Sequence, residues 1–300
     1  MLKIAFHKHY VHPLPKGHRF PMAKYELLPQ QLLLEGTVEE SAFFSPGKIA
    51  KENILAVHDD VYFNDLLELR LDRRAQRKTG FEHNKELILR EQLLVEATRR
   101  CTEYALENGI SMNIAGGTHH AFSNRGEGFC LLNDQAVAAS WLLRNKKAEK
   151  ILIIDLDVHQ GNGTAEIFKN TPDVFTFSMH GENNYPLKKE TSDMDVPLPD
   201  GIKDNEYLYL LEQSLNHILN IFTPDFLFFQ SGIDIIETDK LGRLGVSIKG
   251  CKQRDEIVFK MAKQLGLPIV VTMGGGYSEQ IKYIIEAHAN TFRTAQHIFF

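Results

Sequence analysis

The segment from residue 151 to residue 163, ILIIDLDVHQGNG, constrains the fold of this chain more than any other. It opens with four apolar residues, which is typical of a parallel strand covered on both faces. Asp155, Asp157 and His159 follow at every second position, so their side chains share one side if the strand continues. One Asp here would indicate only a helix cap, but burying three ionisable groups without partners would be costly. Two carboxylates and an imidazole at a strand end suit a divalent metal such as zinc.

Composition and charge exclude several classes of protein. The chain has 300 residues, 43% of them hydrophobic, and we expect residues 1–300 to form a single domain, although the length would allow two. The net charge of −5 predicts no nucleic-acid partner. No apolar run approaches a membrane span, and the first residues lack a signal-peptide pattern. The three cysteines show no CxxC spacing, which favours a reducing compartment, so we expect a cytoplasmic location.

Strand and helix patterns alternate along the chain, which predicts an α/β fold with a mainly parallel sheet and helices on both faces. Polar motifs follow five of the predicted strands directly. Open sheets of this kind bind ligands at the carboxyl ends of their strands, so we expect the motifs to gather at one edge. They are His119-His120, the series that starts at Asp155, Ser178, Asp234 and Tyr277.

Three other polar segments are expected to lie outside regular secondary structure. Residues 70–83 are strongly charged and predict a solvated surface loop. Residues 181–201 predict a long irregular segment. A loop rich in proline near the start of the chain holds four histidines that we expect to be solvated or locally bonded, namely His7, His9, His12 and His18.

Asp157, His159 and Asp234 are candidate ligands of one metal ion. Three protein ligands leave a coordination position for water and substrate, which is typical of catalytic rather than structural sites. A metal held in this way acidifies its bound water and polarises a carbonyl. Asp234 taken alone would be a helix or turn cap.

The remaining motifs suit acid–base chemistry beside such a metal. His119 and His120 offer groups that titrate near neutral pH, although a paired histidine after two glycines can be purely structural. Tyr277 follows three glycines, and its hydroxyl could donate to an oxyanion. The three glycines are not a phosphate-binding loop, because no Lys-Ser or Lys-Thr follows them.

The motifs GGTHHA, GFC, DLDVHQGNG, SGIDIIETDKLG and GGGY together resemble the zinc-dependent histone deacetylase family, and most closely its class IV branch. The resemblance keeps the family's motif order and covers nearly the whole chain. It implies a three-layer arginase/deacetylase fold, hydrolysis of N-acyl-lysine amides, one zinc ion per chain and a bound potassium ion. The implied partners are an acyl-lysine protein or peptide, or an acetylated small amine; the oligomeric state stays open.

The resemblance also implies a role for each matching residue. The zinc ligands would be Asp157, His159 and Asp234, with His120 as the general acid/base and Tyr277 polarising the scissile carbonyl. His119 would be an electrostatic partner oriented by Asp155, and Asn162 stands where the class I branch often has a second Asp. Arg19 aligns with an inner-channel arginine. The tunnel lining would be Gly128, Phe129, Tyr185, Leu241, Gly275 and Gly276, and the potassium site Asp155, Asp157, His159, Ser178 and Met179.

Three rival functions have distinct sequence requirements. A ureohydrolase with two metals needs a further carboxylate where this chain has Gly161, which favours one metal. A catalytically silent binding module would have lost Tyr277, a histidine or a ligand, and none is lost. A polyamine deacetylase would favour an acidic gate, for which Glu182 and Glu237 are candidates.

The class IV resemblance further implies that long fatty acyl groups are hydrolysed better than acetyl. Each buried methylene contributes about 0.8 kcal/mol, so a dry pocket for a few extra carbons would raise kcat/KM at least tenfold. The alternative is an acetyl-sized site whose deeper space is filled by side chains.

Overall fold

A computed structural model describes residues 1–300 and contains one eight-stranded sheet. All its strand pairs are parallel, and the strand order is β2-β1-β3-β8-β7-β4-β5-β6. The α/β class and the parallel sheet are therefore confirmed. The strands are β1 (Lys3–Ala5), β2 (Phe43–Phe44), β3 (Ile110–Asn113), β4 (Ile151–Asp155), β5 (Val174–Gly181), β6 (Met194–Leu198), β7 (Phe226–Gln230) and β8 (Ile269–Thr272).

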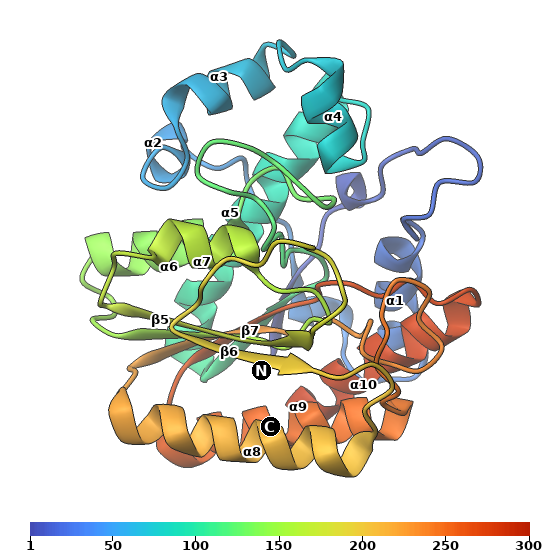
Figure 1. The fold of residues 1–300 in the computed structure, drawn as a ribbon, viewed down its shortest axis with the longest axis vertical. Coiled ribbons are helices and arrows are strands. Elements are labelled where there is room, and N and C mark those ends of the chain that lie inside the picture. Colours follow the sequence, from blue (N-terminus) through green and yellow to red (C-terminus); the bar gives the residue numbers. More distant parts are fainter.

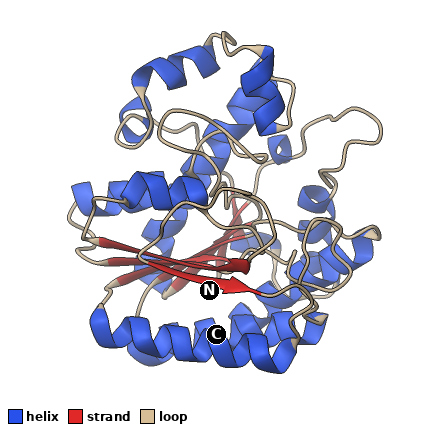
Figure 2. Cartoon of the chain, in the orientation of Figure 1, coloured by secondary structure: helices blue, strands red, loops and turns tan.

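Helices cover both faces of this sheet, as a covered parallel sheet requires. The helices are α1 (Lys24–Leu34), α2 (Lys51–Ile54), α3 (Asp60–Leu67), α4 (Arg73–Thr79), α5 (Lys85–Asn108), α6 (Asp134–Arg144), α7 (Asn162–Phe168), α8 (Asp204–Ile221), α9 (Ile248–Leu265) and α10 (Ile281–Phe299). In Figure 1, α8 and α9 lie along one face, and α6 and α7 lie along the other. Figure 2 shows the strands as the middle of three layers.

None of the helices combines the length and the apolarity that crossing a membrane requires.

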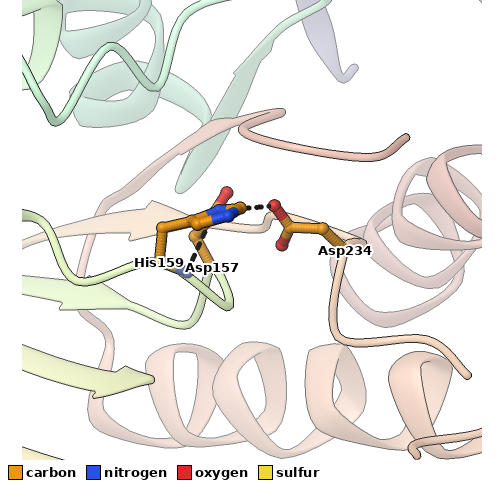
Figure 3. A group of neighbouring side chains, drawn as sticks. All are labelled: Asp157, His159 and Asp234. Carbon is orange, nitrogen blue, oxygen red and sulfur yellow. Dashed lines mark hydrogen bonds and ion pairs between the residues drawn. The ribbon is translucent and has the colours of Figure 1, made fainter. Parts of the chain in front are cut away.

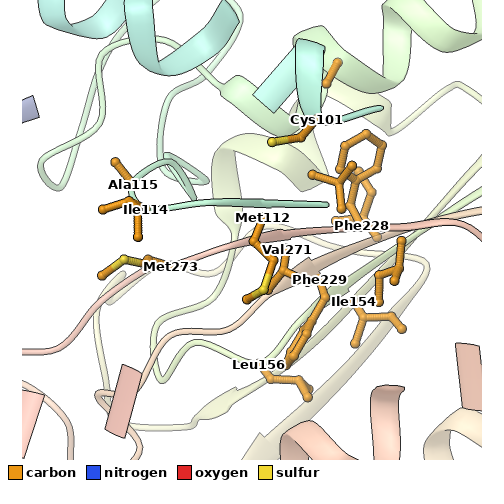
Figure 4. Close-up of a cluster of buried hydrophobic side chains, with 14 of the residues drawn as sticks. Cys101, Met112, Ile114, Ala115, Ile154, Leu156, Phe228, Phe229, Val271 and Met273 are labelled. Atoms are coloured by element: carbon orange, nitrogen blue, oxygen red, sulfur yellow. The ribbon is translucent and has the colours of Figure 1, made fainter. Parts of the chain in front are cut away.

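The core is continuous from the first strand to the last helix and contains 76 buried hydrophobic residues. The strands β4 and β7 run side by side at its centre, with Ile154 level with Phe229. Phe228 and Phe229 are fully buried, and Figure 4 shows them with the apolar side chains around them. Burial of one such side chain contributes about 1.5–3 kcal/mol, so the central strands are fixed mainly by apolar packing.

The expectation of a surface loop at 70–83 is wrong, because the helix α4 occupies half of that segment. Asp72 caps its first turn by accepting from the Ala75 N–H at 2.7 Å, and Gly80 ends it in the left-handed conformation at φ 77°. Arg, Lys, Gln and Ala are strong helix formers, so a capped run of them folds although it is highly charged.

The segment 181–201 is not wholly irregular either, because it contains β6 at the edge of the sheet. The sequence did not predict this strand because it contains Asp195 and Pro197, and both residue types are rare in strand interiors. Pro197 is tolerated because an edge strand has one side without a ladder partner. The two-residue strand β2 was also not predicted.

Arg254 on α9 ties together the chain segments that follow β4 and β7. Its guanidinium donates to the backbone carbonyls of Leu156, Ser231 and Gly232, and it forms an ion pair with Asp255 at 2.8 Å. Both partners of this ion pair are completely buried. A planar guanidinium with five donors suits such a cluster of carbonyls. Arg254 therefore links α9 to the loops that follow β4 and β7.

Replacing Arg254 with methionine should lower the free energy of unfolding by about 3–5 kcal/mol, because Asp255 would remain buried without its cation. Chemical denaturation followed by circular dichroism measures this change. Arg293→Met is the matched control, because Arg293 also pairs with carboxylates but lies partly exposed. The control should lose less than about 1 kcal/mol. Equal small losses in both variants would contradict the anchoring role.

Candidate active site

Asp157, His159 and Asp234 come together in a buried group at the carboxyl edge of the sheet. One ligand atom from each residue lies within 4.8 Å of the others. The His159 Nδ1 atom is 3.0 Å from Asp157 Oδ1 and 3.1 Å from Asp234 Oδ2. Figure 3 shows the imidazole between the two carboxylates.

A continued strand does not cause this convergence, because β4 ends at Asp155. The chain instead turns, and side-chain oxygens accept from nearby backbone N–H groups. Asp157 N–H donates to Asp155 Oδ1 at 3.2 Å, and His159 N–H donates to Asp157 Oδ1 at 3.0 Å. Asp234 reaches the group from the loop after β7 and accepts from the Val158 N–H at 2.9 Å. The structure brings the three predicted residues together, although the strand does not continue through them.

The donor set of this group fits a divalent cation. Asp157 Oδ2 accepts only from the Gly275 N–H at 2.7 Å, and the buried Asp234 Oδ2 lies 3.1 Å from His159 Nδ1 but accepts no hydrogen bond of regular geometry. Burial and the neighbouring charge of Asp157 raise the pKa of Asp234 to about 7. Buried carboxylate oxygens without donors are costly unless a cation satisfies them, and two carboxylates with one imidazole are common zinc ligands.

His119 is held beside two carboxylates. Its Nδ1 lies 2.6 Å from Asp155 Oδ2, and its Nε2 lies 4.0 Å from Asp157 Oδ1. Burial alone would lower the pKa of His119, but Asp155 and Asp157 outweigh burial and raise it to about 8. This imidazole is therefore predominantly protonated at neutral pH.

His120 lies beside His119, but its surroundings lower its pKa instead of raising it. Its Nδ1 is 2.6 Å from Asn162 Oδ1, an uncharged acceptor at the start of α7. Burial, followed by the charges of His119 and His159, lowers the pKa of His120 well below its usual range. The amide oxygen favours the tautomer with a proton on Nδ1, which leaves Nε2 free to accept a proton.

An open pocket of about 370 Å³ leads from the surface to these residues. Its lining includes four of the predicted tunnel residues, Gly128, Phe129, Tyr185 and Leu241, together with His120, His159 and Tyr277. A smaller cavity of about 40 Å³ adjoins it and reaches Asp157 and Gly275. The Tyr277 ring centroid lies 6.4 Å from that of His159, so this tyrosine stands at the junction of the two cavities.

The prediction for Gly276 is wrong, because this residue lines neither of the two cavities. A Cβ atom added at Gly276 would meet the side chains of Ile233 and His288. Arg19 is not the expected inner-channel arginine, because it lines the outer pocket. The arginine that lines the inner cavity is Arg90. Gly276 and Arg19 both lie outside helices and strands, where residue spacing does not predict the direction of a side chain.

The residues proposed for a monovalent cation are only partly grouped by the sheet. Asp155 on β4 is level with Ser178 on β5, and Met179 follows Ser178 on the same strand. The Ser178 hydroxyl lies 3.0 Å from His180 Nδ1. A potassium site at these residues stays a prediction.

Lys24 is a site residue that sequence reasoning missed. It is completely buried on α1, and its Nζ donates to the Gly274 carbonyl at 3.0 Å. Burial lowers the pKa of Lys24 to about 8, although Asp234 and Asp157 oppose this change. A lysine near the start of an amphipathic helix resembles a surface residue, so its sequence carried no signal of this position.

The family model "Histone deacetylase domain" matches residues 18–292 of this chain. The chain belongs to the histone deacetylase family. It is therefore a hydrolase of this deacetylase family, and its single parallel sheet between two layers of helices is the arginase/deacetylase fold. The class IV branch is not distinguished by this match.

Individual proteins and solved structures are also similar to this chain over most of its length. An uncharacterized protein of Picosynechococcus sp. is 38% identical over 296 residues, which cover 99% of both chains. Histone deacetylase 2 of Arabidopsis thaliana is 29% identical over 281 residues, covering 91% of this chain and 73% of that protein. An HDAC homolog from Aquifex aeolicus aligns with a TM-score of 0.81 and 27% identity over 97% of this chain and 82% of its own. An HDAC homolog complexed with SAHA aligns over the same shares, with a TM-score of 0.81 and 28% identity.

Replacing Asn162 with aspartate should raise the pKa of His120, because a carboxylate stabilises the imidazolium form. The His120 resonance in an NMR pH titration of the metal-loaded protein should therefore move at higher pH than in the parent. Asn145→Asp, at an exposed position outside the site, serves as the control and should leave the His120 titration unchanged. An unchanged or lowered pKa in Asn162→Asp would contradict the contact.

Replacing Asp234 with alanine should abolish tight metal binding, because it removes one of three ligands. Equilibrium dialysis against zinc, followed by elemental analysis, measures the bound metal. Asp239→Ala is a demanding control, because Asp239 lies in the same loop region but outside the ligand group. Stoichiometric zinc in Asp234→Ala would show that the ligand assignment is wrong.

Proposed function

We propose that this chain hydrolyses the amide bond of N-acyl-lysine side chains in proteins or peptides, with one bound zinc ion. The observation that carries this proposal is a pair of adjacent histidines at the metal group with different hydrogen-bond partners. His119 contacts the Asp155 carboxylate, which favours its charged form, whereas His120 contacts the uncharged Asn162 amide and burial favours its neutral form. A neutral imidazole and a nearby cation are what proton transfer from water to an amine requires.

Asp157, His159 and Asp234 would hold the zinc ion, and the Gly275 N–H would keep Asp157 oriented. When bound, zinc lowers the pKa of a water ligand and polarises the substrate carbonyl. Gly161 stands where a second metal would need a carboxylate, which supports one ion rather than two. Potassium binding remains part of the proposal, with Asp155, Asp157, His159, Ser178 and Met179 as its residues.

The protein's own groups would carry the proton and the developing charge. His120 would accept a proton from the attacking water at Nε2, with Asn162 fixing the ring through Nδ1. The same nitrogen would then protonate the leaving lysine amine. His119 would remain charged and stabilise negative charge in the transition state, while the Tyr277 hydroxyl would donate to the carbonyl oxygen as it becomes an oxyanion.

Deacetylation of an acetylated polyamine is the alternative within the same chemistry. It was expected to require an acidic gate, and neither candidate carboxylate lines the pocket. Glu237 instead pairs with Lys203 at 3.3 Å. The pocket lining thus supports an acyl-lysine substrate over a polycation.

Two broader expectations also remain proposals. Residues 1–300 would form a single catalytic domain, which the continuous core supports. A cytoplasmic location is supported by three cysteines that are all buried and unpaired. Membership of the class IV branch rests on the motif wording alone.

Replacing Tyr277 with phenylalanine should reduce kcat on an acetyl-lysine peptide by about a hundredfold or more, with a smaller change in KM. The change removes only a hydroxyl that would act mainly in the transition state. Tyr185→Phe is the matched control, because the Tyr185 hydroxyl also lies at the pocket but bonds to Glu127. An unchanged kcat in Tyr277→Phe, with chemistry rate-limiting, would exclude an oxyanion role.

A preference for fatty acyl groups is the finer prediction and depends on the inner cavity. At about 40 Å³, it has room for about three water molecules, so a long chain requires it to open. Measured kcat/KM for acetyl-, octanoyl- and myristoyl-lysine in one peptide, below micelle-forming concentrations, should rise with chain length. A steady fall would show an acetyl-sized site and would leave the deacylase proposal intact.

A further inference from the structure

The mouth of the outer pocket is lined by cations and by no acid. Arg19, Arg77, Lys78 and Arg243 are all exposed there, and no Asp or Glu is among the lining residues. The whole chain has a net charge of −5, so this cluster is opposite in sign to the molecule as a whole. We call these four residues the cationic rim.

Two rim residues are partly neutralised by carboxylates just outside the lining. Lys78 Nζ lies 3.5 Å from Glu127, but Glu127 also pairs with Arg125 at 3.0 Å. Arg243 lies 3.3 Å from Asp200, and both side chains are about half exposed, so solvent screens this pair. Glu127 and Asp200 are therefore already paired with cations.

Arg19 and Arg77 have no carboxylate partner. The Arg19 guanidinium lies 5.5 Å from the centroid of the Phe129 ring on the pocket wall. Arg77 lies in the last turn of α4, and no ion pair involves it. Glu82 lines a neighbouring hollow with Arg77 without pairing with it. These two guanidiniums are free to bind an anion that arrives at the mouth.

Backbone contacts hold the rim against the pocket wall. The Gly128 N–H donates to the Lys78 carbonyl at 3.0 Å, and the Phe129 N–H donates to the Thr79 carbonyl at 2.9 Å. His18, next to Arg19, reaches the Gly80 carbonyl at 2.9 Å through its Nε2. The end of α4 and the Arg19 loop are thus fixed to the segment that carries Phe129, so the charges have a defined place.

We propose that the cationic rim selects acyl-lysines that lie in acidic peptide segments. This inference rests on the proposed function, because the acyl-lysine side chain must fill the pocket for its neighbours to meet the rim. Glu or Asp residues next to the acyl-lysine would then pair with Arg19 and Arg77, whose planar donors suit carboxylates. Lysine-rich segments and polyamines would be repelled by the same charges.

The test compares peptides that differ only in the residues flanking one acetyl-lysine: two Glu, two Gln or two Lys on each side. In low salt, kcat/KM should fall from the acidic to the neutral to the basic peptide, by about two- to fivefold per rim contact. The difference should shrink in 0.5 M NaCl, because salt screens exposed charges. Equal values for the three peptides, or a preference for the basic one, would overturn the proposal.

Charge reversal on α4 locates the effect. Arg77→Glu should remove most of the preference for the acidic peptide over the neutral one. Arg74→Glu is the matched control, because Arg74 makes the same charge change on the same helix but does not line this pocket. An equal loss of preference in both variants would show a general charge effect and contradict a defined rim.

Binding of the same peptides, labelled with a fluorophore, separates this inference from the proposed function. If no peptide is hydrolysed but the acidic one binds most tightly, the rim holds and the hydrolase proposal fails. Hydrolysis without any ranking, in rate or in binding, leaves the hydrolase intact and overturns the rim. A preference for free Nε-acetyl-lysine over every peptide would overturn an acidic segment as the occupant.

Discussion

The structure depends on the burial of three carboxylates, Asp155, Asp157 and Asp234, at one edge of a parallel sheet. Burying them without compensation would be prohibitive, so the surrounding chain supplies donors and cations. His119 pairs with Asp155, His159 lies between Asp157 and Asp234, and backbone N–H groups complete part of the set. One oxygen of Asp234 is left over, and a metal ion is the partner that would satisfy it.

The same buried charges explain how two adjacent histidines acquire different protonation states. The carboxylates keep His119 charged, and the resulting cation, together with burial, keeps His120 neutral. Asn162 fixes the second ring without adding a charge of its own. Proton transfer and charge stabilisation are thereby assigned to different residues by environment rather than by residue type, which is a general feature of acid–base sites.

Much of the fold and most of the site could be predicted from the sequence, because apolar strands and the polar residues that follow them leave a regular pattern. Asp157, His159 and Asp234 met as expected, and Asn162 contacts His120. The predictions that were wrong depended on the direction of the backbone outside helices and strands, or on tertiary contacts that outweigh the preferences of the local residues. The charged helix α4 and the edge strand β6 were hidden by their residue types, and the buried position of Lys24 left no local signal.

The central claim is that this metal group, with His120 as the proton carrier, hydrolyses an acyl-lysine amide. The most direct measurement follows release of acetate from an acetyl-lysine peptide by protein stripped with a chelator and then titrated with zinc. Turnover should vanish on stripping and return to a plateau at one zinc per chain, in parent protein but not in His120→Ala. Turnover that persists without detectable metal, or its absence from fully zinc-loaded parent protein on every acyl-lysine peptide, would contradict the claim.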